Sequence, residues 1–339
     1  MKQFEGYRRG INLGGWFSQC DNSIDTYNNF IKKEDFKRIS RWGLDHVRIP
    51  VDYNLFQNRD CSFKESGFDR IDNCIKWCKE YGLNMILDLH KTIGFSFDDN
   101  EAEDGFFEKE EYQENFYNVW QQFAKRFGNY DNVAFGLLNE ITRYDYKDIW
   151  NQVSTETIKI IRQYAPGVKI LIGGYYNNDI SAIKDLLEPY DENIVYEFHC
   201  YSPLIFTHQG AYWINGMDTD FTMNLDESIE NYQKYSSEYI KNGYIADFDG
   251  INVIDEQYFE KFFKEAINIA EERNVPLYCG EYGVIDRADP FESLKWLKLI
   301  NSVFEKYQIG RALWNYKEKD FGLVDAHYDE VRDEYLKFM

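Results

Sequence analysis

The sequence has few basic residues for its number of acidic ones, and it has no long apolar run. Of its 339 residues, 38 are Lys or Arg and 59 are Asp or Glu, a formal net charge of −21. A surface of that sign repels phosphate backbones and anionic lipids, so we expect neither nucleic acid nor a membrane as partner. No stretch has the length of a membrane span, and the first residues have no apolar signal-peptide core. We therefore expect a cytoplasmic protein and leave secretion open.

Histidines are scarce, and a glycine-rich phosphate loop is missing. The five histidines lack the spacing of metal ligands, so we expect no metal and no cofactor. The first apolar run is followed by Gly14-Gly15-Trp16, which does not fit a phosphate-binding loop and disfavours an open doubly wound sheet. Cys74 and Cys78 lie four apart on a predicted helix with no histidine nearby to complete a metal site, and we expect all six cysteines to be reduced and structural.

Aromatic residues, in contrast, are abundant. The chain has 27 Tyr, 26 Phe and 8 Trp, and hydrophobic residues make up 44% of it, which suffices for a large core. Tyr and Trp at this level suit a surface that binds flat ligands with polar edges. Sugar rings have this character, because their C–H faces stack on aromatic rings while their hydroxyls form hydrogen bonds at the rim.

Short apolar runs alternate with segments of helical periodicity along the chain. Amphipathic helices are predicted over residues 33–42, 68–81, 115–127, 149–164 and 256–273. Strands are predicted over residues 10–14, 46–50, 85–90, 133–140, 169–173, 194–199, 277–281 and 311–315. Eight repeats of strand and helix in one chain predict an α/β fold, a closed (β/α)₈ TIM barrel that forms a single catalytic domain over residues 1–339.

The interval between the sixth and seventh predicted strands is longer than the others. One helix over residues 256–273 accounts for the usual crossover and leaves residues 202–255 as additional chain. An insertion at this point of a barrel lies on its C-terminal face, over the active site. We predict that residues 202–255 form an inserted subdomain or lid.

Polar and aromatic side chains stand at or just beyond the C-terminal ends of the predicted strands. Polar groups inside an apolar strand are costly unless they are paired or used. In a barrel these strand ends converge on one bowl. The candidate site residues are Arg48, His90, Asn139, Glu140, His199, Tyr201, Glu281 and Trp314.

Two of these candidates, Glu140 and Glu281, belong to strands four and seven and would face each other across the bowl. Glycoside cleavage with retention needs two carboxyl groups about 5 Å apart, one to attack the anomeric carbon and one to protonate the leaving oxygen. An adjacent arginine favours the ionised form of one of them. Arg48 is the candidate for that task.

The motifs Leu137-Leu138-Asn139-Glu140 and Cys279-Gly280-Glu281-Tyr282-Gly283 resemble the two signatures of glycoside hydrolase family 5, in clan A. In that family the same eight residue types follow the same strands in the same order. Within it, the chain is similar to clostridial cellulases of the endoglucanase C type over residues 10–16, 206–209, 278–281 and 314–317. That type also carries a subdomain after strand six. Many members have a second histidine where this chain has Lys91.

The resemblance implies a retaining β-glycoside hydrolase with Glu140 as acid/base and Glu281 as nucleophile. Its activity would be that of an endo-β-1,4-glucanase on β-glucans or cello-oligosaccharides, and we expect a monomer. The other six residues would bind substrate or orient the glutamates: Asn139 at the sugar 2-hydroxyl, Arg48 and Tyr201 on Glu281, His199 on Glu140, His90 beside the cleaved sugar and Trp314 beneath it.

Other functions remain open on the sequence alone. An exo-acting β-glucosidase, a β-1,3-glucanase or a β-mannanase of the same family would differ in whether the loops form a closed pocket or an open cleft. Intact Glu140 and Glu281 disfavour a carbohydrate-binding protein without catalysis. A metabolic barrel would bind phosphate after strands seven and eight, where Glu281, Trp314 and Asp320 suit a neutral sugar better.

Several further residues have a less specific interpretation. We expect His208 and His327 to be ordinary loop residues, and we assign no role to His46. Five aromatic residues either line outer sugar subsites or pack beneath loops: Phe95, Phe97, Phe106, Phe107 and Trp213.

Overall fold

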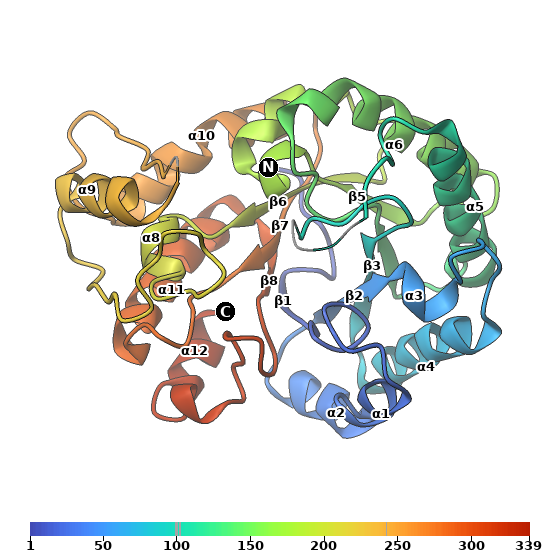
Figure 1. The fold of residues 1–339 in the computed structure, drawn as a ribbon, viewed down its shortest axis with the longest axis horizontal. Helices are drawn as coiled ribbons and strands as arrows, with labels where there is room; N and C mark the ends of the chain where they lie inside the picture. The colour runs from blue at the N-terminus through green and yellow to red at the C-terminus, as the bar shows by residue number, and fades with distance from the viewer. Residues whose placement is uncertain (99–100, 102, 242) are drawn as a thin grey trace.

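The structure, a computed structural model, describes residues 1–98, 101, 103–241 and 243–339. Eight parallel strands pair in chain order, and the last pairs with the first, which closes the barrel (Figure 1). The (β/α)₈ prediction is confirmed, and every predicted strand overlaps an observed one. The strands are β1 (Arg9–Asn12), β2 (His46–Asp52), β3 (Asn84–Lys91), β4 (Val133–Gly136), β5 (Lys169–Ile172), β6 (Ile194–Cys200), β7 (Leu277–Tyr282) and β8 (Gly310–Leu313).

Helices cover the outside of the barrel. The long ones are α2 (Lys33–Arg41), α4 (Glu65–Tyr81), α5 (Glu110–Phe127), α6 (Lys147–Arg162), α9 (Ile229–Tyr239), α10 (Glu256–Glu272) and α11 (Pro290–Tyr307). The shorter ones are α1 (Ile24–Asn29), α3 (Tyr53–Phe56), α7 (Tyr175–Asn178), α8 (Leu204–Thr207) and α12 (Arg332–Phe338), with 3₁₀ turns η1 (Tyr144–Tyr146), η2 (Ile180–Asp185) and η3 (Ala326–Tyr328). The crossover after β5 therefore has only α7 and η2 where the others have a long helix.

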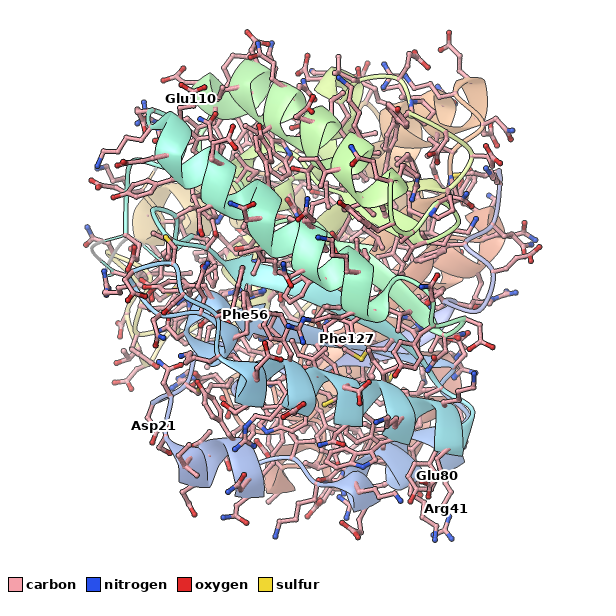
Figure 2. The ribbon with its side chains drawn as sticks, turned by 90° about the vertical axis from the view of Figure 1, so that its right-hand side faces the viewer. Asp21, Arg41, Phe56, Glu80, Glu110 and Phe127 are labelled. Carbon is pink, nitrogen blue, oxygen red and sulfur yellow. The ribbon has the colours of Figure 1, made fainter. Side chains whose placement is uncertain are left out.

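The helices form where apolar residues recur at helical spacing. In α5, the residues Phe116, Val119, Trp120, Phe123 and Phe127 are buried and share one face, while the opposite face carries charged side chains into solvent (Figure 2). Truncating a buried Phe of this kind to Ala costs about 3–5 kcal/mol.

Two buried tryptophans tie helices to the upper ends of strands. Trp120 of α5 donates to the carbonyl of Leu137, just after β4, at 3.2 Å. Trp150 of α6 donates to the carbonyl of Gly173, just after β5, at 2.8 Å. A buried indole N–H needs such a partner, and here the partners are the backbone segments that lead to the candidate site.

The lower end of the barrel is closed by apolar side chains. Phe4 and Tyr7 stack there with ring centroids 4.1 Å apart. Directly above them, the buried ring of His46 contacts Asp45 through Nδ1 at 2.6 Å and the hydroxyl of Tyr278 through Nε2 at 2.7 Å. His46 therefore has a structural place at the floor, and the polar end of the barrel is the opposite one.

Residues 201–255 follow β6 and precede α10, and they include α8 and α9. This segment packs on α11, because Trp296 of α11 donates to the carbonyl of Ser202 at 3.0 Å and Glu292 of α11 accepts from the amide of Leu225 at 2.9 Å. Within the segment, the buried Tyr232 of α9 donates back to the carbonyl of Leu225 at 3.0 Å. The additional chain thus lies against the barrel beside the upper ends of β6 and β7.

Two further features bear on the expectations from composition. No helix in the described parts of the chain combines the length and apolar character that crossing a membrane requires. The six cysteines are all free; Cys74, Cys78, Cys200 and Cys279 are buried, and Cys61 is exposed.

Candidate active site

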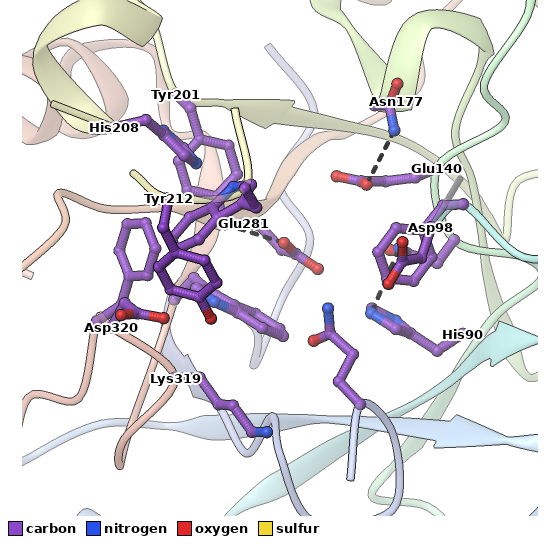
Figure 3. Close-up of a pocket in the computed structure, with 16 residues that line it drawn as sticks. His90, Asp98, Glu140, Asn177, Tyr201, His208, Tyr212, Glu281, Lys319 and Asp320 are labelled. Carbon is purple, nitrogen blue, oxygen red and sulfur yellow. Dashed lines mark hydrogen bonds between the residues drawn. The ribbon is translucent and has the colours of Figure 1, made fainter. Parts of the chain in front are cut away.

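The eight predicted site residues come together at the C-terminal ends of the strands. A cavity of about 590 Å³ opens there (Figure 3). Six of the eight line it: His90, Asn139, Glu140, Tyr201, Glu281 and Trp314. Arg48 lies beneath the cavity and is fully buried, and His199 stands between Glu140 and the barrel interior.

Glu140 and Glu281 project into this cavity from opposite sides (Figure 3). Glu140 has a left-handed backbone, with φ 48°, just after β4, and Glu281 is the penultimate residue of β7. One ligand atom each from Glu140, His199 and Glu281 lie within 4.8 Å of one another. This spacing between the carboxylates is close to the ~5 Å of retaining glycosidases and shorter than the ~6.5–9.5 Å of inverting ones.

Among the residues that the structure describes, Glu140, His199 and Glu281 are the group of potential ligands close enough to share one metal ion. Their polar atoms are, however, already engaged. His199 Nδ1 lies 2.8 Å from Glu140 Oε1, and both oxygens of Glu281 accept hydrogen bonds from protein side chains. The arrangement fits a pair of oriented carboxyl groups better than a set of open ligands.

Glu281 is held by two donors. Arg48 Nη1 donates to Oε1 at 2.8 Å, and the Tyr201 hydroxyl donates to Oε2 at 3.0 Å. Burial, with the charges of Glu281 and Glu140, raises the pKa of Tyr201 well above its ordinary value, so this hydroxyl keeps its proton. Both donors fix the orientation of the carboxyl group that would attack an anomeric carbon.

Arg48 is shared by two further buried carboxyl groups that the sequence prediction missed. Its Nη2 lies 2.9 Å from Asp88 Oδ1, and its Nε lies 3.3 Å from Glu197 Oε1. Burial raises the pKa of Asp88, and it raises the pKa of Glu197 to about 7. For Arg48 itself, burial alone would lower the pKa, but Asp88, Glu197 and Glu281 together raise it above the ordinary value.

Asp88 and Glu197 had a signal in the sequence. Each stands two residues before a histidine of the site, His90 or His199, and side chains two apart in a strand point to the same face. Asp88 Oδ2 lies 2.7 Å from His90 Nδ1, and Glu197 Oε1 lies 4.0 Å from His199 Nε2. The strand period therefore places a second, deeper acidic layer under the predicted one.

The two histidines have opposite electrostatic settings. Burial lowers the pKa of His90 well below its ordinary value, so its ring is neutral. Burial alone would also lower the pKa of His199, but the carboxylates of Glu281 and Glu140 raise it. His199 Nδ1 thus donates to Glu140, while His90 presents an uncharged polar ring to the cavity.

One side of the cavity has the form of a sugar platform. The ring planes of Trp314 and His90 are parallel to within 1°, with centroids 6.1 Å apart. A Cβ on Gly14 would lie 2.5 Å from the Trp314 ring, so the absence of a side chain there lets the indole lie flat against the backbone. Asn139 Oδ1 accepts from Arg48 Nη2 at 2.8 Å, which fixes the amide and leaves its Nδ2 on the His90 side.

The cavity also contains residues beyond the eight predicted ones. His208 lines it, which corrects its interpretation as an ordinary loop residue; burial lowers its pKa to about 3, so the ring is neutral. Phe97 and Trp213 line the cavity as well, whereas Phe95, Phe106 and Phe107 are buried in the core. The remaining lining residues are Gln19, Asp98, Asn177, Tyr212, Lys319, Asp320 and Phe321.

A second hollow of about 1000 Å³ continues from the first on the far side of Glu140. The two share the lining residues Glu140, Asn177, Tyr201, His208 and Trp213. The second hollow has a more apolar lining that includes Leu204, Ile214, Tyr244 and Phe262. The concave surface therefore extends to both sides of the carboxylate pair.

Comparison with known proteins agrees with this geometry. The family model for cellulases of glycosyl hydrolase family 5 matches residues 9–320. The chain belongs to this family. It is thus a glycoside hydrolase, and the resemblance predicted from the strand-end residues is confirmed.

Individual relatives cover nearly all of the chain. Cellodextrinase A of Ruminococcus flavefaciens is 46% identical over 312 residues, 92% of this chain and 86% of that protein. Endoglucanase C of Acetivibrio thermocellus is 35% identical over 338 residues, 98% of each. The solved structure of Thermotoga maritima Cel5A in complex with cellobiose superposes with a TM-score of 0.76 at 25% identity and covers 97% of both chains.

Proposed function

We propose that the protein is a retaining endo-β-1,4-glucanase that cleaves cello-oligosaccharides and soluble β-glucans, with Glu281 as nucleophile and Glu140 as acid/base. The observation that carries the proposal is the pair of carboxyl groups in one cavity at no more than 4.8 Å. That separation leaves room for direct attack on the sugar and none for an intervening water.

In the first step, a Glu281 oxygen attacks the anomeric carbon while Glu140 gives its proton to the glycosidic oxygen. The C–O bond to the leaving sugar breaks, and an ester between Glu281 and the retained sugar forms. In the second step, Glu140 takes a proton from water, and the water oxygen displaces Glu281 from the same carbon. Two inversions give net retention, and Glu140 regains its proton.

The surrounding groups suit these steps. Arg48 and Tyr201 each donate to one oxygen of Glu281 and hold it aimed at the reacting carbon. The Nδ2 of Asn139 is placed to donate to the hydroxyl next to the reacting carbon, a contact that strengthens in the transition state. The face of Trp314 supports the ring of the attacked sugar.

Endo-action is supported by the shape of the site. The two hollows meet at Glu140, so sugar units fit on both sides of the cleaved bond. An exo-acting enzyme would need a wall on one side of the pair. The names of the relatives, a cellodextrinase and an endoglucanase, support a β-1,4-glucan as the substrate.

We also propose that residues 1–339 form one catalytic domain, in which residues 202–255 are a subdomain that walls the cleft. His208 and Trp213 come from this segment, and both line the two hollows.

Product analysis on defined oligosaccharides tests the proposal. Cellotetraose to cellohexaose should release mixtures of shorter oligosaccharides, and laminari- and manno-oligosaccharides should react much more slowly. Glucose as the sole product from every chain length would refute endo-action, and faster cleavage of the β-1,3 or mannose series would refute the substrate. Glu281→Gln, which keeps shape and removes the nucleophile, should lower turnover by about three or more orders of magnitude while the variant still binds the oligosaccharide.

A further inference from the structure

The segment after β5 contains three consecutive non-glycine residues in the left-handed backbone region. Tyr176, Asn177 and Asn178 have φ angles of 52°, 59° and 56°. A left-handed conformation costs an L-residue roughly 1–2 kcal/mol, less for Asn, and it persists only where surrounding contacts hold it. Such backbone outliers cluster at functional sites, so the side chains that this bend of three residues positions are candidates for a functional role.

The bend is fixed to the two strands that carry the acid/base and its histidine. The amide of Asn177 donates to the carbonyl of Ile141, the residue after Glu140, at 3.0 Å. The backbone of Asp179, which follows the bend, pairs with that of His199 in β6 through an isolated parallel β-bridge. The start of the bend is held by Trp150, whose indole donates to Gly173.

The side chains of the bend then reach the Glu140–His199 couple. Asn177 Nδ2 donates to Glu140 Oε2 at 3.2 Å (Figure 3), and the buried Asn178 amide lies 3.5 Å from His199 Nε2. Glu140 Oε1 and His199 Nδ1 are 2.8 Å apart. A Cβ on Gly173 would fall 2.3 Å from Asn178 Oδ1, so only glycine leaves space for this amide.

We propose that Asn177 is a positioning residue for the acid/base, and that Asn178 supports it by fixing His199. The inference deepens the proposed function and rests on Glu140 being the acid/base. Both Glu140 oxygens then have a partner, His199 on Oε1 and Asn177 on Oε2, so the carboxyl group cannot rotate away from the glycosidic oxygen. Asn178 offers both a donor and an acceptor, and it can therefore pair with His199 Nε2 whether that nitrogen is bare or protonated.

Asn177 is exposed and lines both hollows, whereas Asn178 is buried. Asn177 therefore stands where the leaving sugar departs from Glu140. An asparagine is also tolerated in left-handed turns for its backbone alone. A test has to separate the side-chain amide from the backbone conformation.

Glycine makes this separation, because it adopts positive φ without cost. Asn177→Gly keeps the bend and removes only the amide, while Asn274→Gly makes the same exchange at a left-handed residue, with φ 48°, that lines neither hollow. The two variants are compared by kcat/KM on cellotetraose, whose leaving group needs a proton, and on 2,4-dinitrophenyl β-cellobioside, whose leaving group does not.

Asn177→Gly should lower kcat/KM on cellotetraose by about 10–100-fold, part of the ~10²–10⁴-fold that general acid catalysis contributes. It should leave kcat/KM on the dinitrophenyl substrate within about threefold of the parent, because that leaving group needs no proton. Asn274→Gly should be near the parent on both substrates, because it leaves the contacts of Glu140 intact. Equal losses on both substrates, or no difference between the two glycine variants, would overturn the proposal.

Glu140→Ala on the same two substrates separates this inference from the proposed function. If Glu140 is the acid, the variant loses cellotetraose activity and largely keeps kcat/KM on the dinitrophenyl substrate. If it shows no such split, the acid/base assignment fails and the asparagine inference fails with it. A split for Glu140→Ala without one for Asn177→Gly overturns the asparagine inference alone.

The supporting role of Asn178 has its own readout. In the ¹⁵N NMR spectrum, Asn178→Ser should change the imidazole shifts of His199, and Asn274→Gly should leave them unchanged. Unchanged His199 shifts in folded Asn178→Ser would remove Asn178 from the proposal, and Asn178→Ala gives a second variant if the serine protein does not fold.

Discussion

Arg48 Nη1 donates to Glu281 Oε1 at 2.8 Å from directly beneath the cavity, and the same guanidinium contacts Asp88 and Glu197. One fully buried cation thus faces three buried carboxyl groups. A guanidinium suits this task because it stays charged and its planar fork reaches several acceptors at once. The nucleophile is therefore held by a cation that also pairs with two other buried carboxyl groups, Asp88 and Glu197.

Removing the Arg48 charge should destabilise the barrel. In Arg48→Met, three buried carboxyl groups lose the guanidinium that pairs with all of them, and breaking a buried pair costs about 3–5 kcal/mol. Arg48→Lys is the matched control, since it keeps the charge and loses the fork. Denaturant unfolding measures the effect, and an Arg48→Met protein as stable as the parent would show that the cluster does not need the cation.

Glu197→Gln should change how stability depends on pH. Burial raises the pKa of Glu197 from 4.5 to about 7, so between these values the folded chain keeps a proton that the unfolded chain has lost. This group's contribution to stability therefore falls as pH rises through that window, and above pH 7 the full cost of the buried charge is present. Gln does not titrate, and its amide oxygen can still accept from Arg48 Nε.

The difference in unfolding free energy between Glu197→Gln and the parent should therefore shift in favour of the variant from pH 4.5 to pH 7, by on the order of 3 kcal/mol. The exposed Glu272→Gln serves as control and should give a flat difference. Urea unfolding at a series of pH values provides the measurement, and a flat Glu197→Gln curve would contradict the buried, protonated state.

Trp314→Ala should weaken binding of the attacked sugar. The indole forms one wall of the cavity and lies parallel to His90, and losing a buried aromatic face costs about 1.5–3 kcal/mol. We expect kcat/KM on cellotetraose to fall about 10–100-fold. Tyr190→Ala, at an exposed aromatic residue before β6, is the control and should match the parent. Equal activity of the two variants would remove Trp314 from the site.

Trp213→Ala should affect long substrates more than short ones. Trp213 lines both hollows and is 43% exposed, so part of its indole remains open to solvent. We expect the rate ratio of cellohexaose to cellotriose to fall, because the longer chain has more sugar units that can reach the exposed indole. A uniform loss on all lengths would place Trp213 at the cleaved bond and not at the rim of the cleft.

The strand-end residues could be predicted from sequence because the barrel makes their positions a matter of counting. Once eight strands are recognised, period two decides which side chains face inward, and the ends of parallel strands meet. The same counting would have found Asp88 and Glu197, which stand two residues before His90 and His199.

Loop residues could not be predicted in this way. Asn177 reaches Glu140 only because three residues in succession are left-handed, and no periodicity signals that conformation. His208 lines the cavity because residues 201–255 pack on α11, a tertiary arrangement without a local pattern. Phe95 and Phe97 are only two positions apart, yet Phe97 lines the cavity and Phe95 packs in the core. Tertiary packing decides this difference as well.

The spacing of Glu140 and Glu281 makes a stereochemical statement that can be measured directly. Proton NMR of a fresh digest of a cello-oligosaccharide resolves the anomer released first, before mutarotation. A carboxylate separation within 4.8 Å predicts the β-anomer as the initial product, by retention. Initial release of the α-anomer would mean inversion through an intervening water and would contradict the roles assigned to both glutamates.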